Sequence, residues 1–180
     1  MNIKWVKFHK TLLTPLGSCI KTNNLTGVKF LLDSKASPII DINSYGSKPL
    51  DEAAWLGFSD IFSCLLDYGA IGNDGLTYGA LQGAIHKKMF TALKNLILHN
   101  CDVNETYFGG TPLRAALTCG RSNSGDVRMV KILLRAKAVV DMQTVGGIDT
   151  FYPDWRNTSH IELAKKYSNV KCVQAIIQAI

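Results

Sequence analysis

One apolar motif returns five times along this chain, and it restricts the possible folds more than any other feature. Its copies begin at Thr14, Lys48, Gly79, Thr111 and Ser159. Each opens with a triplet that ends in Leu or Ile, and each continues through a polar step into a stretch rich in Leu and Ile. A helical unit of this length cannot bury its apolar face alone, whereas stacked units can. The repeat therefore predicts an all-α solenoid.

The residues at the start and end of each copy have a physical role in the helices. A threonine such as Thr14 can cap a helix by accepting from its free N–H groups, and Pro15 loses no hydrogen bond at the first helical position. Gly57 and Gly120 are placed to end first helices, and Gly69 a second helix, because glycine tolerates left-handed backbone. Each copy is thus expected to contain two short helices.

The motif resembles the ankyrin repeat. The second copy, from Lys48 to Ala70, is the cleanest match, and the fourth opens with Gly109-Gly110-Thr111-Pro112-Leu113-Arg114-Ala115-Ala116. The resemblance covers about residues 12–180 and implies a single domain over 1–180, with stacked helix–turn–helix units and protruding β-hairpin loops. The expected repeats are approximately 12–43, 44–73, 74–104, 105–141 and 142–180. The last includes an enlarged hairpin insert at 142–158.

The third copy departs furthest from the pattern. It has neither Thr nor Pro at its start, and Gly83 lies inside its first helix. A helical glycine costs about 1 kcal/mol relative to alanine. We therefore predict that the third repeat is locally weak, with its first helix poorly protected from hydrogen exchange.

Composition indicates a soluble, intracellular protein. The 180 residues are 47% hydrophobic, yet no apolar run approaches the length of a membrane span. Lysines interrupt the first thirteen residues, which are expected to form an N-terminal cap rather than a signal peptide. The five cysteines include no C-x-x-C pair and favour a reducing compartment. We expect the cytoplasm, or a host cell after export.

The net charge of +6 is divided into blocks, with basic ends and an acidic middle. Arg128, Lys131 and Arg135 share one face of an expected helix. A solvated surface explains this stripe, and contact with nucleic acid or acidic lipid is the alternative. Alternating blocks favour a partner with patterned charge, so nucleic acid is not the expected partner.

The resemblance places a binding surface on the concave groove and the hairpin tips, because ankyrin arrays bind partner proteins there. The groove positions are the two residues before the end of each first helix. The proposed partner-binding residues are Trp55, Leu56, His86, Lys87, Cys119 and Tyr167 in the groove, Tyr45, Tyr78, Tyr107 and Phe108 at the tips, and Tyr152 and Trp155 in the insert. Exposed aromatic anchors within a polar rim are typical of binding hot spots.

Structural explanations for these aromatic residues stay open. The tip tyrosines can pack on adjacent hairpins instead of on a partner. The insert that carries Tyr152 and Trp155 can fold back as a plug or be presented to a partner. It also precedes the final repeat, where it can help to cap the array. We expect a monomer, or a weak dimer through the C-terminal edge, where Ile176, Ile177 and Ile180 are apolar.

Few residues suggest covalent chemistry. Cys119 and His86 occupy expected groove positions and could form a thiol–imidazole pair, but no orienting acid is evident. A Cys/His hydrolase is therefore only a rival hypothesis, and we expect no enzyme activity, cofactor, metal site or small-molecule substrate. Asn104 lies in a segment that resembles sites modified by asparaginyl hydroxylases, although a hairpin asparagine can also serve its own backbone.

These features together predict a protein–protein interaction module that binds through the groove and tips. Irregular repeats and frequent Lys, Asn and Ile also resemble ankyrin effectors that intracellular bacteria or large viruses send into host cells, which is the alternative setting. The identity of the partner is not encoded in any of these patterns.

Overall fold

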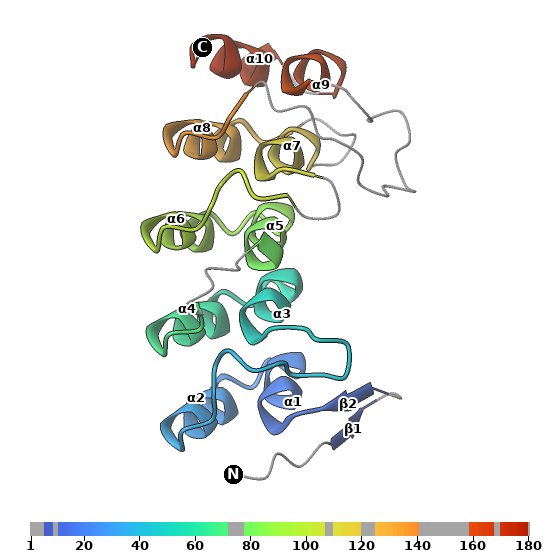
Figure 1. The fold of residues 1–180 in the computed structure, drawn as a ribbon, viewed down its shortest axis with the longest axis vertical. Coiled ribbons are helices and arrows are strands. Elements are labelled where there is room, and N and C mark those ends of the chain that lie inside the picture. The colour runs from blue at the N-terminus through green and yellow to red at the C-terminus, as the bar shows by residue number, and fades with distance from the viewer. Residues whose placement is uncertain are drawn as a thin grey trace. The chain divides into compact units, whose positions relative to one another are not determined.

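The structure, a computed structural model, describes residues 6–8, 11–71, 78–106, 110–119, 125–140, 159–167 and 170–179. The regular structure of the described chain is almost entirely helical (Figure 1). In chain order its elements are β1 (Val6–Phe8), β2 (Thr11–Leu13), α1 (Pro15–Lys21), α2 (Leu25–Asp33), α3 (Pro49–Leu56), α4 (Ser59–Asp67), α5 (Tyr78–His86), α6 (Phe90–Leu98), α7 (Pro112–Thr118), α8 (Val127–Arg135), α9 (His160–Tyr167) and α10 (Val170–Ile177). The helix pairs fall within the five expected repeat ranges.

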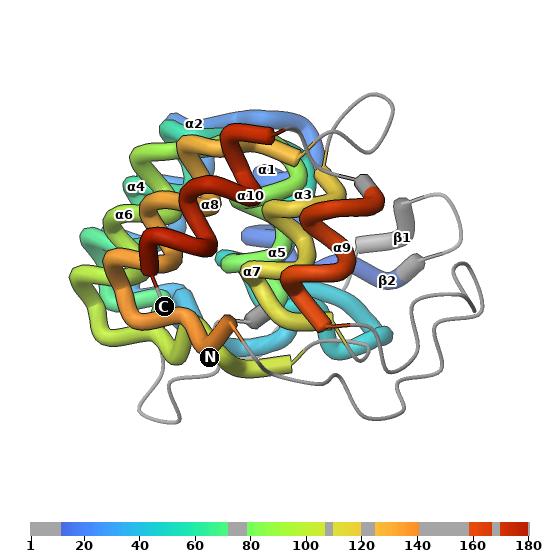
Figure 2. Tube along the Cα trace, turned by 90° about the horizontal axis from the view of Figure 1, so that it is seen from above, coloured from blue at the N-terminus to red at the C-terminus, as the bar shows by residue number. Residues whose placement is uncertain are grey.

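The backbone forms two compact units, residues 1–92 and 93–180. In the first unit α3 packs on both α1 and α5 in one layer, and α2 packs on α4 in a second layer. Figure 2 shows these two layers as overlying tubes, with α1, α3 and α5 in one group and α2 and α4 in the other. In the second unit α7 packs on α9, and α8 packs on α10. The single continuous domain over 1–180 stays a prediction.

The expected helix caps are present where the motif is intact. The Oγ1 atom of Thr14 accepts from the Gly17 N–H at 3.0 Å, and that of Thr111 accepts from the Arg114 N–H at 3.1 Å. Lys48 provides no side-chain cap to α3, because an ammonium group cannot accept a hydrogen bond from a helix N–H. It instead forms an ion pair with Asp41 at 2.8 Å.

Left-handed glycines end two helices as predicted. Gly57 has φ +80° directly after α3, and Gly69 has φ +75° two residues after α4. Gly120, the third expected terminator, lies outside the described residues. Helix α7 already ends at Thr118, and Cys119 follows in extended backbone with φ −73° and ψ 105°. The fourth repeat therefore leaves its first helix differently from the second.

Each unit has its own apolar core. In the first unit Phe62 of α4 and Ile85 of α5 are completely buried, and Ala53 and Ala54 bury the small-residue face of α3. In the second unit Leu133 and other residues of α8 are buried, together with the apolar face of α9. The fully buried residues of this second core include Leu117, Met129, Val130, Leu133 and Ala164.

The N-terminal segment contains a short antiparallel hairpin. β1 and β2 pair in the register Val6 to Leu13 and Phe8 to Thr11. Leu13 is buried, and its backbone also bridges to Asn43 in the loop after α2. Among the described segments, the β1–β2 pair has the hairpin character that the ankyrin resemblance implies.

None of the described helices has the length and apolarity that a membrane crossing requires.

Candidate functional site

The surface of the first unit is organised by a close approach between α3 and α5. A Cβ atom added to Gly83 would lie 2.9 Å from both the Ala54 Cβ and the Trp55 backbone nitrogen. Such a distance is too short for a real side chain, so only glycine allows the two helices to pack this closely. The glycine that weakens an isolated helix thus has a packing function here. The predicted weakness of the third repeat remains a prediction.

This close approach brings two aromatic rings together at the ends of the helices. Trp55 of α3 and His86 of α5 are stacked, with ring centroids 5.3 Å apart and an interplanar angle of 24°. Trp55 keeps 38% of its surface exposed, and His86 is also exposed. The stacked pair is therefore a preformed aromatic surface that solvent can reach.

The electrostatics favour an uncharged His86. Desolvation of the ring is the main influence that lowers its pKa below the ordinary value, and the charge of Lys87 acts in the same direction. A neutral imidazole over the indole face gives an apolar surface rather than a cationic one. The pair therefore suits burial against an apolar group.

Charged residues lie close in sequence to this aromatic pair, Glu52 on α3 and Lys87 directly after α5. Lys21 of α1 and Glu52 of α3 form an ion pair across adjacent helices. The methylene chain of Lys87 lies over Gly57, since a Cβ built there would be 3.6 Å from the Lys87 Cδ. Leu56 is half-buried beside Trp55 in the sequence. The groove residues proposed in the first unit thus reach the surface, apart from the partly covered Leu56.

Asp51 stabilises the start of the neighbouring helix, a contact that the sequence did not reveal. The carboxylate of Asp51 accepts a hydrogen bond from the Ala80 backbone N–H in the first turn of α5. A Cβ on Gly79 would lie 2.5 Å from its Oδ2 atom. Burial dominates and raises the pKa of Asp51 to about 6, although the Ala80 hydrogen bond and Lys48 oppose this. A carboxylate of the second repeat therefore binds the first turn of the third repeat's first helix.

Tyr45 is presented by a tight turn in the loop after α2. Its side chain is 80% exposed. The buried Asn43 accepts from the Tyr45 N–H at 2.9 Å and the Ser47 N–H at 3.1 Å, and Gly46 adopts φ +78°. Sequence reasoning missed Asn43, whose place just before the Ser-Tyr-Gly tip was the available signal. The exposed tip that was expected for Tyr45 is present.

Several of the proposed residues lie where the structure gives no side-chain position. Tyr78 and Tyr167 belong to α5 and α9, but their side chains are outside the described set. Four others lie wholly outside the described residues: Tyr107, Phe108, Tyr152 and Trp155. Their roles stay predictions, as does the choice between plug and presentation for the 142–158 insert.

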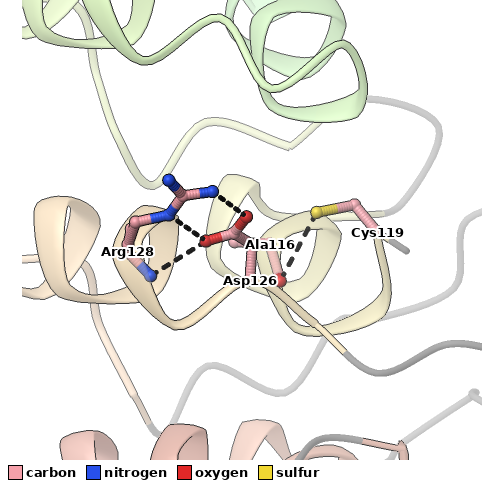
Figure 3. Close-up of polar contacts among 4 residues, drawn as sticks. All are labelled: Ala116, Cys119, Asp126 and Arg128. Atoms are coloured by element: carbon pink, nitrogen blue, oxygen red, sulfur yellow. Dashed lines mark hydrogen bonds and ion pairs between the residues drawn. The ribbon is translucent and has the colours of Figure 1, made fainter. Parts of the chain in front are cut away.

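The placement of Cys119 on an exposed groove is wrong. Its side chain is only 5% exposed, and its thiol donates to the Ala116 carbonyl at 3.5 Å (Figure 3). The sequence argument assumed that α7 ends like α3, but the extended backbone at Cys119 turns the side chain inward. A buried thiol in this setting behaves as a small apolar group. The geometry gives no support to the Cys/His hydrolase.

Asp126 caps α8 and pairs with Arg128 in the same view. Its Oδ1 accepts from the Arg128 backbone N–H at 3.0 Å, and its Oδ2 lies 3.3 Å from a guanidinium nitrogen (Figure 3). Burial acts to raise the pKa of Asp126, but the hydrogen bonds and charge of Arg128 outweigh it and lower the pKa. Arg128 therefore pairs with the N-cap residue of its own helix, unlike a purely solvated member of the basic stripe.

Asn104 links two successive loops of the second unit. Its Oδ1 accepts from the Val139 N–H at 2.7 Å, and its Nδ2 donates to the Lys137 carbonyl at 3.4 Å. Its own backbone N–H donates to Asp102 Oδ1 at 2.8 Å. The side chain thus hydrogen-bonds a neighbouring loop rather than its own backbone. Modification of Asn104 stays a prediction.

His160 makes a second link of this kind. The buried ring lies 2.7 Å from Thr111 Oγ1 through Nε2 and 2.8 Å from the Val140 carbonyl through Nδ1. The carbonyl can only accept, so Nδ1 carries a proton and donates to it. At the same helix start Ser159 and Glu162 form a capping box. The sequence identifies Ser159 only as the start of the fifth copy of the motif, and does not reveal the contacts of His160. Among the described residues no group of three His, Cys, Asp or Glu side chains could hold a metal ion.

Solved ankyrin-repeat structures share this fold at low sequence identity. The human ASB11 ankyrin repeat domain matches with a TM-score of 0.73 and 22% identity, over 99% of this chain and 73% of that chain. An ankyrin repeat domain from Acinetobacter baumannii AYE matches with a TM-score of 0.72 and 20% identity, over 92% and 81% respectively. The ankyrin repeat domain of Bcl-3 matches with a TM-score of 0.70 and 23% identity, over 92% and 69%.

These structures define the fold of the chain. The chain has the ankyrin-repeat fold, an all-α solenoid, as the repeated motif predicted. No protein-family model matches the sequence, and no curated protein matches it either. Ankyrin-repeat domains are generally protein–protein interaction modules and are typically non-catalytic.

Proposed function

We propose that this protein binds a partner protein through the surface formed by Trp55, His86 and Lys87. The observation that carries the proposal is the exposed, stacked Trp55–His86 pair at the ends of two closely packed helices. A large aromatic group that is already held in place loses little conformational entropy on binding. Such groups, ringed by polar side chains, dominate many interfaces.

The surroundings of the pair suggest the chemistry of the partner. The charge of Glu52 is matched by Lys21, whereas Lys87 is an exposed cation beside the aromatic surface. An apolar side chain placed over Trp55 and followed by a carboxylate near Lys87 would complement this surface. Tyr45, on the exposed turn of the same unit, is a further contact candidate.

The test compares Trp55→Ala with a matched surface variant. Phe30→Ala removes another exposed aromatic side chain, from α2 in the other layer, and serves as the control. Proteins retained by the wild type and by Phe30→Ala, but not by Trp55→Ala, are identified by quantitative affinity purification. The dissociation constant of one such purified partner is then measured by calorimetry.

We expect Trp55→Ala to weaken binding by about 2 kcal/mol, roughly a thirtyfold rise in Kd. The melting temperature of the variant should stay near that of the wild type. Retention of the same set of proteins by Trp55→Ala and the wild type would contradict the proposal. A large fall in melting temperature would show instead that Trp55 supports the fold.

A further inference from the structure

The second unit has a groove between α8 and α10. The two helices pack against each other. The groove between them has a volume of about 350 Å³ and is lined by Lys131, Leu134, Arg135, Ala175, Gln178 and Ala179. None of these residues was among the proposed partner-binding positions. The groove is therefore distinct from the surface around Trp55.

Two cations stand along one side of this groove. Lys131 and Arg135 are both exposed and lie four residues apart on α8, so they project from the same face. Neither side chain makes an ion pair or hydrogen bond with any residue that the structure describes. Neither α8 nor α10 contains an acidic residue. The positive charge at the groove is thus uncompensated within the two helices that form it.

The opposite wall combines an apolar floor with an amide. On this wall Ala175 of α10 is buried, and Gln178, directly after α10, is exposed. Leu134, which is half-buried on α8 beside Arg135, adds to the apolar floor. Lys171 lies one helical turn before Ala175 and extends the positive charge along α10. Small residues on one wall and long cations on the other leave room for an inserted side chain.

We propose that this groove binds an acidic peptide segment of a partner protein, with an apolar side chain on the Ala175 floor. Its carboxylates pair with Lys131 and Arg135, and the Arg135 guanidinium can bind a carboxylate through two parallel hydrogen bonds. Gln178 can hydrogen-bond the peptide backbone. Charge complementarity selects the segment, and the apolar floor fixes its register.

Nucleic acid and membrane surfaces fit this groove less well. Duplex binding requires cations along an extended phosphate track, and Arg128, the next basic residue of α8, is held by Asp126. Binding to an anionic membrane typically uses a larger cluster of basic residues. Neither ligand would use the apolar floor between the two helices.

The test is a nuclear magnetic resonance titration of the full chain with a defined probe. The probe is a short peptide with the core Glu-Leu-Glu flanked by glycine and serine, and its Gln-Leu-Gln analogue is the matched peptide. We expect amide shifts confined to α8 and α10, and affinity for the acidic peptide that is at least about tenfold above that for the analogue. A short oligothymidine and vesicles containing phosphatidylserine are titrated in parallel.

Paired variants separate this groove from general charge attraction. Lys131→Gln with Arg135→Gln should weaken binding at least about fivefold. Lys29→Gln with Lys94→Gln removes two exposed cations from α2 and α6 and should change affinity less than about twofold. Ala179→Trp keeps every charge but fills the groove, and should also weaken binding.

The proposal is overturned by any of four results. These are absence of peptide binding by the wild type, equal losses in the two double variants, unchanged affinity in Ala179→Trp, and tighter binding of oligothymidine or vesicles than of the peptide. Circular dichroism of each variant verifies that the helices are intact, so a loss of binding reports on the groove.

Discussion

The buried carboxylate of Asp51 should make the stability of this protein depend on pH. Its pKa is raised from 3.8 to about 6 in the folded chain, chiefly by burial between α3 and the start of α5. A tenfold change in proton affinity corresponds to about 1.4 kcal/mol. Relative to the unfolded chain, the folded chain therefore favours the protonated form of Asp51 over the ionised form by about 2 to 3 kcal/mol.

The sign of this pH dependence follows from the direction of the pKa shift. Because the folded pKa lies above the unfolded value, this stabilisation is complete below pH 3.8 and is lost as pH rises through about 6. Asp51→Asn keeps an acceptor for the Ala80 N–H and cannot ionise. At neutral pH the variant should therefore be more stable than the wild type, by about 2 to 3 kcal/mol.

Urea unfolding at a series of pH values measures this difference directly. Between about pH 4.5 and 7.5 the free energy of unfolding of the wild type should fall by about 2 kcal/mol relative to Asp51→Asn. Asp60→Asn, which removes an exposed carboxylate from α4, is the matched control. A difference that does not change with pH would refute the reasoning. So would an Asp51→Asn variant that is less stable at pH 7.5, because the ionised cap would then be net favourable.

Three further changes test the packing and the links between repeats. Gly83→Ala should lower the free energy of unfolding by about 1 to 3 kcal/mol, because its Cβ would collide with α3; a gain in stability would show that helix propensity dominates. Asn104→Ala should cost about 1 to 2 kcal/mol, measured by urea unfolding, and a neutral result would mean that water replaces both loop contacts. Thr111→Ala removes an N-cap and should cost about 1 kcal/mol or more, whereas Thr111→Ser should keep most of the stability; equal losses in the two would contradict the capping role.

The parts of the fold that the sequence predicted depend on local chemistry. Thr14 and Thr111 cap helices because a hydroxyl three residues before a free N–H suffices, and Gly57 ends α3 because left-handed backbone favours glycine. Contacts between repeats were not predictable in this way. The Asp51 cap of α5 joins residues far apart in the chain, and nothing in either copy of the motif alone announces it.

The candidate site could likewise be predicted only in part from the sequence. The exposed positions of Trp55 and His86 followed from the phase of the repeat, but their stacking depends on the close approach at Gly83. Cys119 was misplaced because the phase was transferred to a helix that ends without the same turn. The aromatic residues of the 142–158 insert lie outside the described residues, so their role stays a prediction.

The Asn104 bridge has a consequence for how this sequence can change. Among the described residues, its side-chain amide hydrogen-bonds two backbone groups of the following loop, the Lys137 carbonyl and the Val139 N–H. The side chain of Val139 can therefore be exchanged without loosening the connection, except for proline, which has no N–H to donate. Lys137 has φ +65°, so its replacements are restricted to residues that tolerate left-handed backbone. A designer could thus vary the chemistry of this loop while one asparagine holds it in place.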